Sequence, residues 1–436
     1  MKFDALTSTD RVEPLFPAGH PLARLVRPTF DTIRRTFRDL FVSTIWIDSA
    51  IDPARAGYRP SYESTYGPGS GNIMSFVGAW LSTGGEGNTV LFPEQVDKSL
   101  IEYARSIGLC GKFEIVPSLD ALKERVAKSG RRVYNIDDLG ADFDAHQAVS
   151  SELSRWANSK DELPTLTAFG PSESVRDMYD VTRADFDAAK RGEGRVFLKT
   201  CNTENAGLGV FIAKTYEDFE AHLVGIRERQ KQFDLSRRIV IQPEIKGRNM
   251  SFQALLDPRD RDHVQVVALT DQLVQEDGKT YLSSVNHAIT SENVEPVGAA
   301  ILDLADHIWE RHPDAFGFLM ADFFATDQGA VVYDPGFRPT GNTATAMASH
   351  LARKITGNHF TSKLVPLPTK VAGLTYGGFA KRVGPLADPQ NLVTGRRAVL
   401  PWGWNPIQGF GMIIAIAEDR DAVDALGNEL LAMKFE

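Results

Sequence analysis

Two aspartates lie on either side of a tight turn in the stretch FGFLMADFFATDQGAVVYDPGFRPTGNT, residues 316–343. Asp322 belongs to one expected strand and Asp334 ends the next, so a hairpin could bring their carboxylates side by side. Two close anions in apolar surroundings are costly to bury without a cation. Mg²⁺ is often bound by one or two carboxylates together with nucleotide phosphates. The pattern therefore predicts a magnesium site, with two turn-capping aspartates as the alternative.

Two cations and a glycine turn could serve the same chemistry. Arg338 follows Asp334 by four residues and could bind a phosphoryl oxygen or a carboxylate through two parallel hydrogen bonds. Lys199 lies near the end of an apolar stretch in VFLKTCNTENAGLGVFIAKT, where a buried strand would hold its charge in place. Gly207 and Gly209 follow in a turn whose N–H groups could fold over phosphate oxygens. A plain hairpin with an exposed lysine is the alternative.

The stretch VIQPEIKGRNMSFQALLD, residues 240–257, could bind a nucleoside. One strand ends at Gln242, and a short connection with Glu244 and Ile245 leads to a second strand that carries Asn249. Such a connection can offer backbone groups to an adenine edge, and a polar side chain just beyond it can reach the ribose. An ordinary strand–turn–strand connection is the alternative.

Hydrophobic periodicity predicts the elements that position these residues. In the first third, strands are expected at 43–47, 89–92, 113–116 and 132–136, with helices at 94–107 and 119–128. This βαβ alternation predicts a parallel sheet. The glycine stretches YGPGSGN (66–72) and STGGEGN (82–88) bind phosphate or simply turn the chain, and neither matches G-x-G-x-x-G.

The remainder of the chain shows a different pattern. A helix at 144–159 is expected to end before Pro164. Two strands joined by a glycine turn follow, RVFLKT (195–200) and GLGVFIA (207–213), and then a helix at 216–233 and a strand at 238–242. Antiparallel strands are expected around 252–275 and 317–334. A linker at 366–370 then leads to an α+β piece with a strand at 411–417 and a helix at 420–433.

The order of these motifs resembles the ATP-grasp superfamily over residues 150–350. The resemblance implies a mixed α/β and α+β architecture, namely an ATP-grasp fold preceded by a βαβ domain of the pre-ATP-grasp kind. It implies an N-terminal substrate domain at 1–140, a lid subdomain at 141–245, and a C-terminal subdomain with an α+β tail at 246–436.

The resemblance also implies ATP and Mg²⁺ as cofactors and assigns roles to individual residues. Asp322 and Asp334 match the metal-binding acids, and Lys199 and Arg338 match the catalytic cations. Arg338 corresponds to the arginine of the family's E-x-N-x-R pattern, here D-P-G-F-R. The implied nucleotide-binding residues are Lys160, Lys199, Gly207, Gly209, Gln242, Glu244, Ile245 and Asn249. Among these, Lys160 lies in the generic sequence NSKDELP, and Asn249 stands where a glutamate is common.

Three positions depart from the family pattern. Gly336 replaces the middle asparagine, so a second metal ion loses a ligand that Asn342 or Asp322 could partly replace. An asparagine introduced at position 336 is accordingly expected to cost far less activity than Asp334→Asn and to tighten binding of the second metal ion, unless the glycine is needed for a positive φ. Met320 replaces an arginine that amino-acid ligases often carry, which leaves Arg338 as the candidate for binding the acyl phosphate. Gln242 replaces the hinge glutamate and can still accept a hydrogen bond.

The C-terminal residues 395–430, with the TGN that follows Arg338, also resemble peptide ligases of the pheganomycin-biosynthesis type. Trp402 and Trp404 could line a substrate pocket there, with packing into a local core as the alternative. His287, in YLSSVNHAIT, could position an amine, or it could be a structural histidine.

The implied reaction joins a small-molecule carboxylate, such as an amino acid or peptide, to an amine through an acyl phosphate. A regulatory protein that binds a nucleotide without catalysis, or an ATP-dependent kinase or other phosphotransferase, is the alternative reading. Gly336 and Met320 point toward the regulatory protein. The sequence names neither substrate, and a homodimer remains open beside a monomer.

Composition sets outer limits on these readings. With 436 residues, 42% hydrophobic and 24% charged, the chain has the composition of a soluble globular protein with about two to four domains. The net charge of −9 argues against sequence-independent nucleic-acid binding. No run of 18 apolar residues predicts a membrane span, and the start MKFDALTSTDRVEP lacks the apolar region of a signal peptide. Two cysteines, Cys110 and Cys201, give no disulfide framework, so a reducing, cytoplasmic location is expected.

Overall fold

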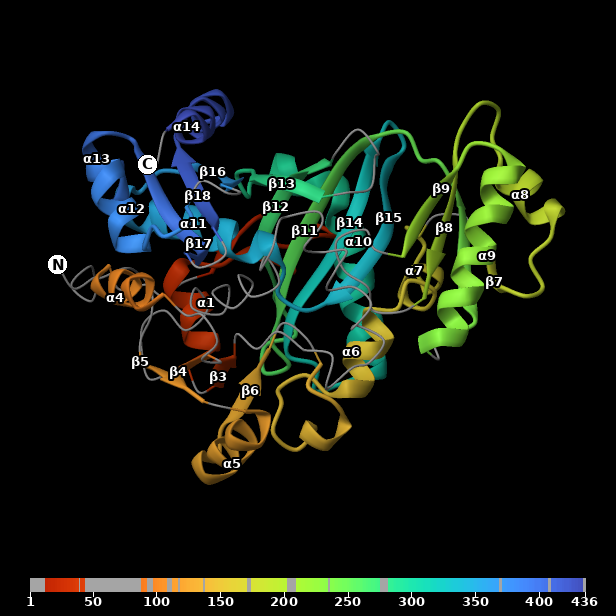
Figure 1. The fold of residues 1–436 in the computed structure, drawn as a ribbon, viewed down its shortest axis with the longest axis horizontal. Coiled ribbons are helices and arrows are strands. Elements are labelled where there is room, and N and C mark those ends of the chain that lie inside the picture. The colour runs from red at the N-terminus through yellow and green to blue at the C-terminus, as the bar shows by residue number, and fades with distance from the viewer. Residues whose placement is uncertain are drawn as a thin grey trace.

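The computed structural model describes residues 12–38, 40–43, 88–91, 97–107, 112–116, 118–135, 138–170, 174–201, 209–233, 236–274, 281–367, 371–406 and 409–433. Within these residues the strands form three sheets (Figure 1). No helix in this part of the chain is long and apolar enough to cross a bilayer.

The largest sheet has ten strands and carries the two aspartates. Its main path runs β15-β14-β11-β12-β13-β16-β18-β17, and all neighbours on this path are antiparallel. These strands are β11 (Arg248–Leu256), β12 (Val264–Val274), β13 (Tyr281–Asn286), β14 (Gly317–Thr326), β15 (Gly329–Phe337), β16 (Thr361–Pro366), β17 (Arg397–Asn405) and β18 (Phe410–Ala417). The C-terminal strands β16–β18 thus extend the same sheet, and the expected α+β tail is continuous with it.

Two short N-terminal strands join this sheet at β12. They are β1 (Glu13–Pro14) and β2 (Leu25–Arg27), and β2 pairs with β12 in parallel. The N-terminal residues of the expected substrate domain, 1–140, therefore contribute strands to the large sheet.

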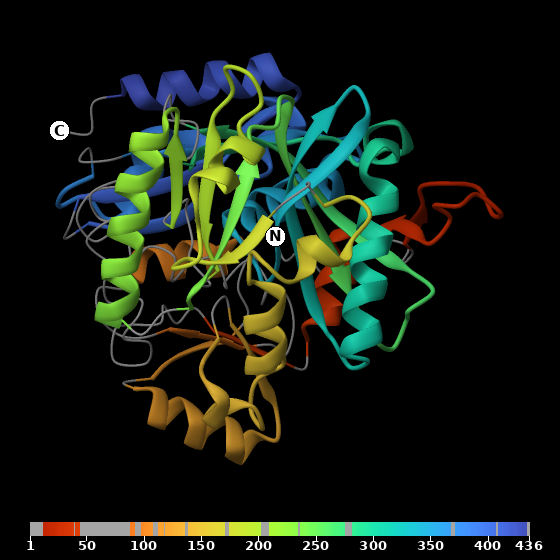
Figure 2. The same cartoon turned by 90° about the vertical axis from the view of Figure 1, so that its right-hand side faces the viewer.

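A second sheet stands at one end of the large sheet, and we call it the lid sheet. It is antiparallel in the order β7-β10-β8-β9, with β7 (Ser174–Asp177), β8 (Val196–Thr200), β9 (Val210–Ala213) and β10 (Arg238–Pro243). Helices α8 (Arg183–Ala189) and α9 (Tyr216–Phe233) pack on it, and Figure 2 shows this unit facing the viewer. The helix, the hairpin and the strand predicted here are confirmed.

The third sheet is parallel, as the βαβ pattern predicted. Its order is β5-β4-β3-β6, with β3 (Leu40–Ser43), β4 (Asn88–Leu91), β5 (Lys112–Ile115) and β6 (Arg132–Tyr134). Helix α5 (Leu119–Ser129) packs its apolar side on this sheet, and α4 (Lys98–Ser106) packs beside α12 (Tyr376–Val383). The glycine stretches 66–72 and 82–88 lie outside the described residues, apart from Asn88.

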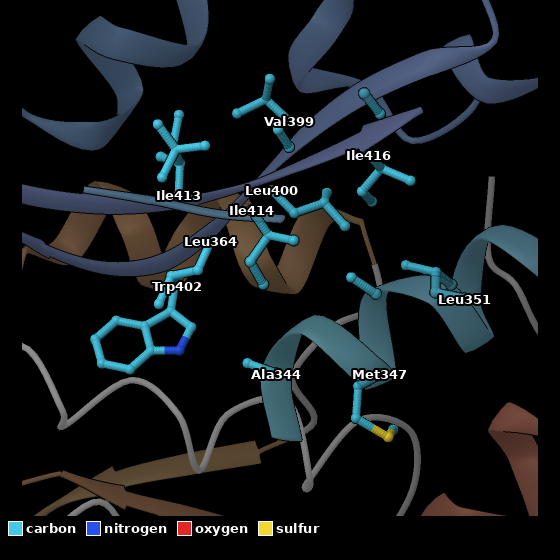
Figure 3. Close-up of a cluster of buried hydrophobic side chains, with 14 of the residues drawn as sticks. Ala344, Met347, Leu351, Leu364, Val399, Leu400, Trp402, Ile413, Ile414 and Ile416 are labelled. Atoms are coloured by element: carbon cyan, nitrogen blue, oxygen red, sulfur yellow. The ribbon is translucent and has the colours of Figure 1, made fainter. Parts of the chain in front are cut away.

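Helices cover both faces of the large sheet. Helix α10 (Ser291–Arg311) packs with Leu269 in one hydrophobic cluster, whereas α11 (Gly341–Thr356) packs with Ala268 in another. Because consecutive strand residues point to opposite faces, the two helices lie on opposite faces. Figure 3 shows the second cluster, in which Trp402 and Leu400 approach the α11 residues Ala344 and Met347.

The remaining helical segments are short, apart from the C-terminal helix. They are α1 (Phe30–Thr36), α6 (Ser151–Ala157), α7 (Leu163–Leu166), α13 (Asn391–Thr394), α14 (Arg420–Ala432) and single 3₁₀ turns at Ala141–Phe143 and Gly384–Ala387.

The helix expected at 144–159 is wrong in its first half. The Asp144 carboxylate accepts hydrogen bonds from the backbone N–H of Ser151 and the side-chain amide of Gln147, both at 2.7 Å. These contacts hold residues 144–150 in turns, and Ser150 then caps α6. Pro164 stands in the first turn of α7, where a proline is tolerated.

Candidate active site

Asp322 and Asp334 are direct cross-strand partners on β14 and β15, as the hairpin predicted. A bulge follows immediately, between Asp322 and Phe323. Burial raises the pKa of Asp322 well above its usual value, and the negative charge of Asp334 raises this pKa further. The side-chain amide of Gln272, from β12, donates to Asp322. The sheet therefore presents two facing carboxylates that favour a nearby positive charge.

Lys160 supplies such a charge. Its ammonium donates to both carboxylate oxygens of Asp334 at 3.1 Å, and its side chain is only 4% exposed. The neighbouring residues hold this lysine in place. The Ser159 hydroxyl donates to the Cys201 carbonyl oxygen at 3.0 Å, and Arg238 of β10 pairs with Asp161 at 2.8 Å. Lys160 is thus fixed between the lid sheet and β15.

Lys199 reaches the same strand from the lid sheet. Its ammonium donates to the Tyr333 carbonyl oxygen at 3.1 Å and lies 5.0 Å from the centre of the Tyr333 ring. The Tyr333 hydroxyl donates to Asn249 Oδ1 at 2.9 Å. Both candidate phosphate-binding lysines therefore end on consecutive residues of β15, and Tyr333 links Lys199 to Asn249.

The hinge residues are placed in different ways. Gln242, at the end of β10, has a buried side chain, and Ile245 lies half-buried in the connection to β11. The Glu244 carboxylate binds Arg195 Nε at 2.8 Å, and its backbone N–H donates to the Arg195 carbonyl oxygen at 2.9 Å. The side chain and N–H of Glu244 therefore join the connection after β10 to Arg195, the residue just before β8.

Only part of the expected glycine loop is described. Gly209 has a positive φ of +72° just before β9, and its carbonyl oxygen accepts from the Thr200 N–H at 2.9 Å. A glycine suits this left-handed position. Gly207 lies outside the described residues.

Arg338 follows the end of β15, and a residue that the sequence did not single out holds it. The side-chain oxygen of Asn158 accepts from Arg338 NH1 at 2.7 Å and from the Phe337 N–H at 3.1 Å. Asn158 caps the C-terminus of α6, with 4% of its surface exposed. Nothing in a lone asparagine two residues before Lys160 marks it as a partner of residue 338.

A side chain at position 336 would require Asn158 or Met320 to move. A Cβ atom on Gly336 would lie 2.7 Å from Asn158 Oδ1 and 2.9 Å from Met320 Sδ. The effect of an asparagine at this position therefore stays a prediction, and it depends on whether these two side chains can shift. Asn342 does not fill the gap. Its amide donates to the Thr270 hydroxyl on β12, two strands and about 10 Å from Asp322.

His287 lies on the opposite face of the sheet from the two acids. It pairs with Asp271 at 3.1 Å, and Arg248 and Arg420 bind the same carboxylate at 2.7 and 2.8 Å. Asp271 precedes Gln272 on β12, and Gln272 contacts Asp322, so the two side chains point to opposite faces. This geometry favours the structural reading of His287.

The two tryptophans belong to the core. Trp402 Nε1 donates to the Gly341 carbonyl oxygen at 3.2 Å, and Trp404 Nε1 donates to that of Leu374 at 2.8 Å. Both rings are buried in the cluster that includes the residues of Figure 3, which favours packing over a substrate pocket.

The donor set at the two acids fits a divalent cation. No group of three or more His, Cys, Asp or Glu side chains among the described residues is arranged to hold a metal. Asp322 and Asp334 nevertheless offer carboxylate oxygens on facing strands, and the Lys160 ammonium already lies against one of them. Mg²⁺ needs only one or two protein carboxylates when phosphates and water complete its shell.

Known structures with this arrangement of sheets have been solved with nucleotides, whereas no protein-family model matches the chain. A biotin carboxylase from Campylobacter jejuni, solved as an ATP complex, matches with a TM-score of 0.54 and 12% identity over 89% of each chain. An N5-carboxyaminoimidazole synthetase from Staphylococcus aureus, complexed with ADP, matches at 0.51 and 12% identity, over 80% of this chain and 91% of that one. An L-amino acid ligase from Bacillus licheniformis matches at 0.51 and 11% identity, over 90% and 97%. The chain therefore has the ATP-grasp fold that its motif order predicted.

Proposed function

We propose that this chain is an ATP- and Mg²⁺-dependent ligase that joins a carboxylate to an amine. One observation carries the proposal. Lys160 from the segment after α6 and Lys199 from the lid sheet reach consecutive residues within β15, namely Asp334, which lies beside Asp322, and Tyr333. Arg338 follows within four residues. Three cationic side chains around two facing carboxylates suit a nucleoside triphosphate, because the cations can bind its phosphates and the carboxylates can bind its metal ion.

Charge placement would carry the first step. A carboxylate oxygen of the acid attacks the γ-phosphorus of ATP, and ADP leaves with the electrons of the broken P–O bond, which gives an acyl phosphate. Lys160 and Lys199 would bind phosphate oxygens, and Arg338 would bind the transferred phosphoryl group through its planar guanidinium. Mg²⁺ held by Asp322 and Asp334 would supply further neutralisation of the β- and γ-phosphate charge.

The second step would complete the amide. The amine nitrogen attacks the acyl carbon, loses a proton, and expels phosphate, which carries away one of the original carboxylate oxygens. The lid sheet would exclude water, which otherwise hydrolyses the acyl phosphate. The known structures named above include an amino-acid ligase, and a small amino acid or peptide as the acid is consistent with that likeness of fold.

Release of ADP and phosphate tests the proposal. The protein is incubated with ATP, Mg²⁺ and a panel of amino acids, peptides and other carboxylates, each with and without a panel of amines. A ligase requires one acid and one amine together for full turnover. Turnover with a single acceptor and a phosphorylated product would instead identify a kinase, and ATP binding without any release would identify a nucleotide-binding regulator.

A further inference from the structure

The four residues after α6 contact two parts of the molecule in alternation. Asn158 and Lys160 bind residues of the β15 end, namely Arg338 and Asp334. Ser159 and Asp161 bind the lid sheet and its loop, through the Cys201 carbonyl oxygen and Arg238. These residues form a turn, with φ −94° and ψ 0° at Asn158, and the sequence NSKD joins the lid sheet to β15.

The orientation of the Asn158 amide follows from its partners. Its Nδ2 donates to the Ser154 carbonyl oxygen at 2.6 Å, which turns Oδ1 toward β15. There Oδ1 accepts from Arg338 NH1 at 2.7 Å and from the Phe337 N–H at 3.1 Å. An amide oxygen has two lone pairs, and both are used.

The same oxygen occupies the space above Gly336. The atom nearest to a hypothetical Cβ at 336 is Asn158 Oδ1, at 2.7 Å. Gly336 has no positive φ that would require glycine. Because the chain conformation alone permits a side chain at 336, the glycine is explained by the close approach of Asn158.

We propose that Asn158 is the positioning residue of Arg338, and that Asn158 and Gly336 form a complementary pair. This inference rests on the proposed function, because it assigns Arg338 to the transferred phosphoryl group. The Asn158 amide, from a distant part of the chain, fills the space that a side chain at position 336 would occupy. It accepts hydrogen bonds from NH1 of the guanidinium and from the neighbouring backbone N–H of Phe337, and so fixes the position of NH1 relative to β15.

A neutral amide suits this position better than a carboxylate. An aspartate at 158 would present its second oxygen to the Ser154 carbonyl oxygen, where the amide now donates at 2.6 Å. Two acceptors at that distance repel each other, so Asn158→Asp should misplace the side chain even though its volume is conserved.

A double-mutant cycle tests the proposal with the acid and amine that the panel identifies. Asn158→Ala should lower kcat by about 10²-fold with little change in the KM for ATP, because a small misplacement of a catalytic group costs a factor of this size. In the Arg338→Ala background, Asn158→Ala should lower kcat by less than about twofold, because its effect passes through the missing arginine. Equal losses in both backgrounds would overturn the proposal.

Two further variants separate positioning from folding. Asn293→Ala is the matched control, because Asn293 also donates an amide hydrogen bond to a carbonyl oxygen, Ala288, on an exposed helix start, and its kcat should stay unchanged. Gly336→Asn alone should lower kcat, and Asn158→Gly combined with Gly336→Asn should recover at least part of that loss. If the double variant has a kcat no higher than that of Gly336→Asn alone, Asn158 and Gly336 are not complementary.

The proposed function and this inference fail in different ways. If the wild-type protein releases no ADP with any acid and amine, the proposed function is wrong. The pair can then still be examined through melting temperatures of the same variants, where recovery of Gly336→Asn by Asn158→Gly supports the packing and its absence refutes it. If the wild type is active and the cycle is additive, only the positioning role is wrong.

Discussion

The ammonium of Lys160 lies 3.1 Å from each carboxylate oxygen of Asp334, although 174 residues separate them in the sequence. This ion pair occupies the oxygens that a metal ion would use. In the absence of nucleotide, Lys160 and Mg²⁺ should therefore compete for Asp334. When ATP is bound, the lysine ammonium can bind phosphate oxygens in place of Asp334.

Lys160→Met should have opposite effects on the two ligands. Two unit charges about 4 Å apart attract by about 4 kcal/mol near a protein surface. If Mg²⁺ no longer has to displace even a third of this attraction between Lys160 and Asp334, Mg²⁺ binds about tenfold more tightly. ATP binding should weaken, because a phosphate partner is lost. Calorimetric titration with Mg²⁺ alone and with ATP measures both changes. Lys128→Met, at an exposed position on α5, is the control, and weaker Mg²⁺ binding by Lys160→Met would contradict this competition.

Lys199→Ala should weaken ATP binding by about 10- to 100-fold, because a hydrogen bond to a charged group contributes about 1.5–3 kcal/mol. Turnover should be nearly lost while the protein stays folded. Calorimetric ATP titration and circular dichroism measure the two properties. Lys214→Ala, an exposed lysine just after β9, should bind ATP normally. Unchanged affinity of the Lys199 variant would remove this residue from the site.

Asp334→Asn should lower kcat by about 10²–10³-fold, the usual cost of losing one electrostatic contribution to a transition state. The aspartate offers a full charge and two oxygens to a hard cation, whereas asparagine offers one neutral oxygen. The variant should also need a higher Mg²⁺ concentration to reach half of its maximal turnover. Asp327→Asn, on the exposed turn of the same hairpin, is the matched control. Near-normal turnover and metal dependence of Asp334→Asn would make Asp334 a turn residue only.

Acid should destabilise the protein through His350, on α11. Burial lowers the pKa of this imidazole to about 4, and the ring Nε2 lies 2.9 Å from the Val267 carbonyl oxygen. The unfolded chain binds a proton near pH 6.5 and the folded chain does not, so stability falls as pH decreases from about 6.5 to 4. The contribution lost by pH 5 is about 2 kcal/mol.

Urea unfolding at pH 7 and pH 5 measures this loss. His350→Gln keeps a donor for the carbonyl oxygen but does not titrate, so its stability should fall by about 2 kcal/mol less than that of the wild type. The exposed residue His263 gives the control variant His263→Gln. Equal losses for wild type and His350→Gln would show that His350 is not the titrating group.

The local parts of the site could be predicted from the sequence. Asp322 and Asp334 are joined by a short hairpin, which brings them near each other, and the bulge between Asp322 and Phe323 then sets the two residues directly opposite each other. Gly209 was expected in a glycine turn for the same local reason, and its positive φ bears this out. Periodicity and turn chemistry act over a few residues, and here they were sufficient.

The contacts that complete the site could not be predicted, because they join distant segments. Asn158 and Arg338 are 180 residues apart, and no periodicity relates them. Asn158 also occupies the space above Gly336, and no local pattern at 336 indicates this contact. The face on which His287 lies depends on strand register, and a single residue of offset separates Asp271 from Gln272.

Transfer of ¹⁸O from the acid to phosphate tests the central claim most directly. The acid found in the panel is labelled with ¹⁸O in its carboxylate and turned over with ATP, Mg²⁺ and the amine, and the released phosphate is analysed by mass spectrometry. An acyl phosphate requires that each phosphate carry one oxygen from the carboxylate. The account predicts one ¹⁸O per phosphate formed. Phosphate without label, released while the amide forms, would contradict it.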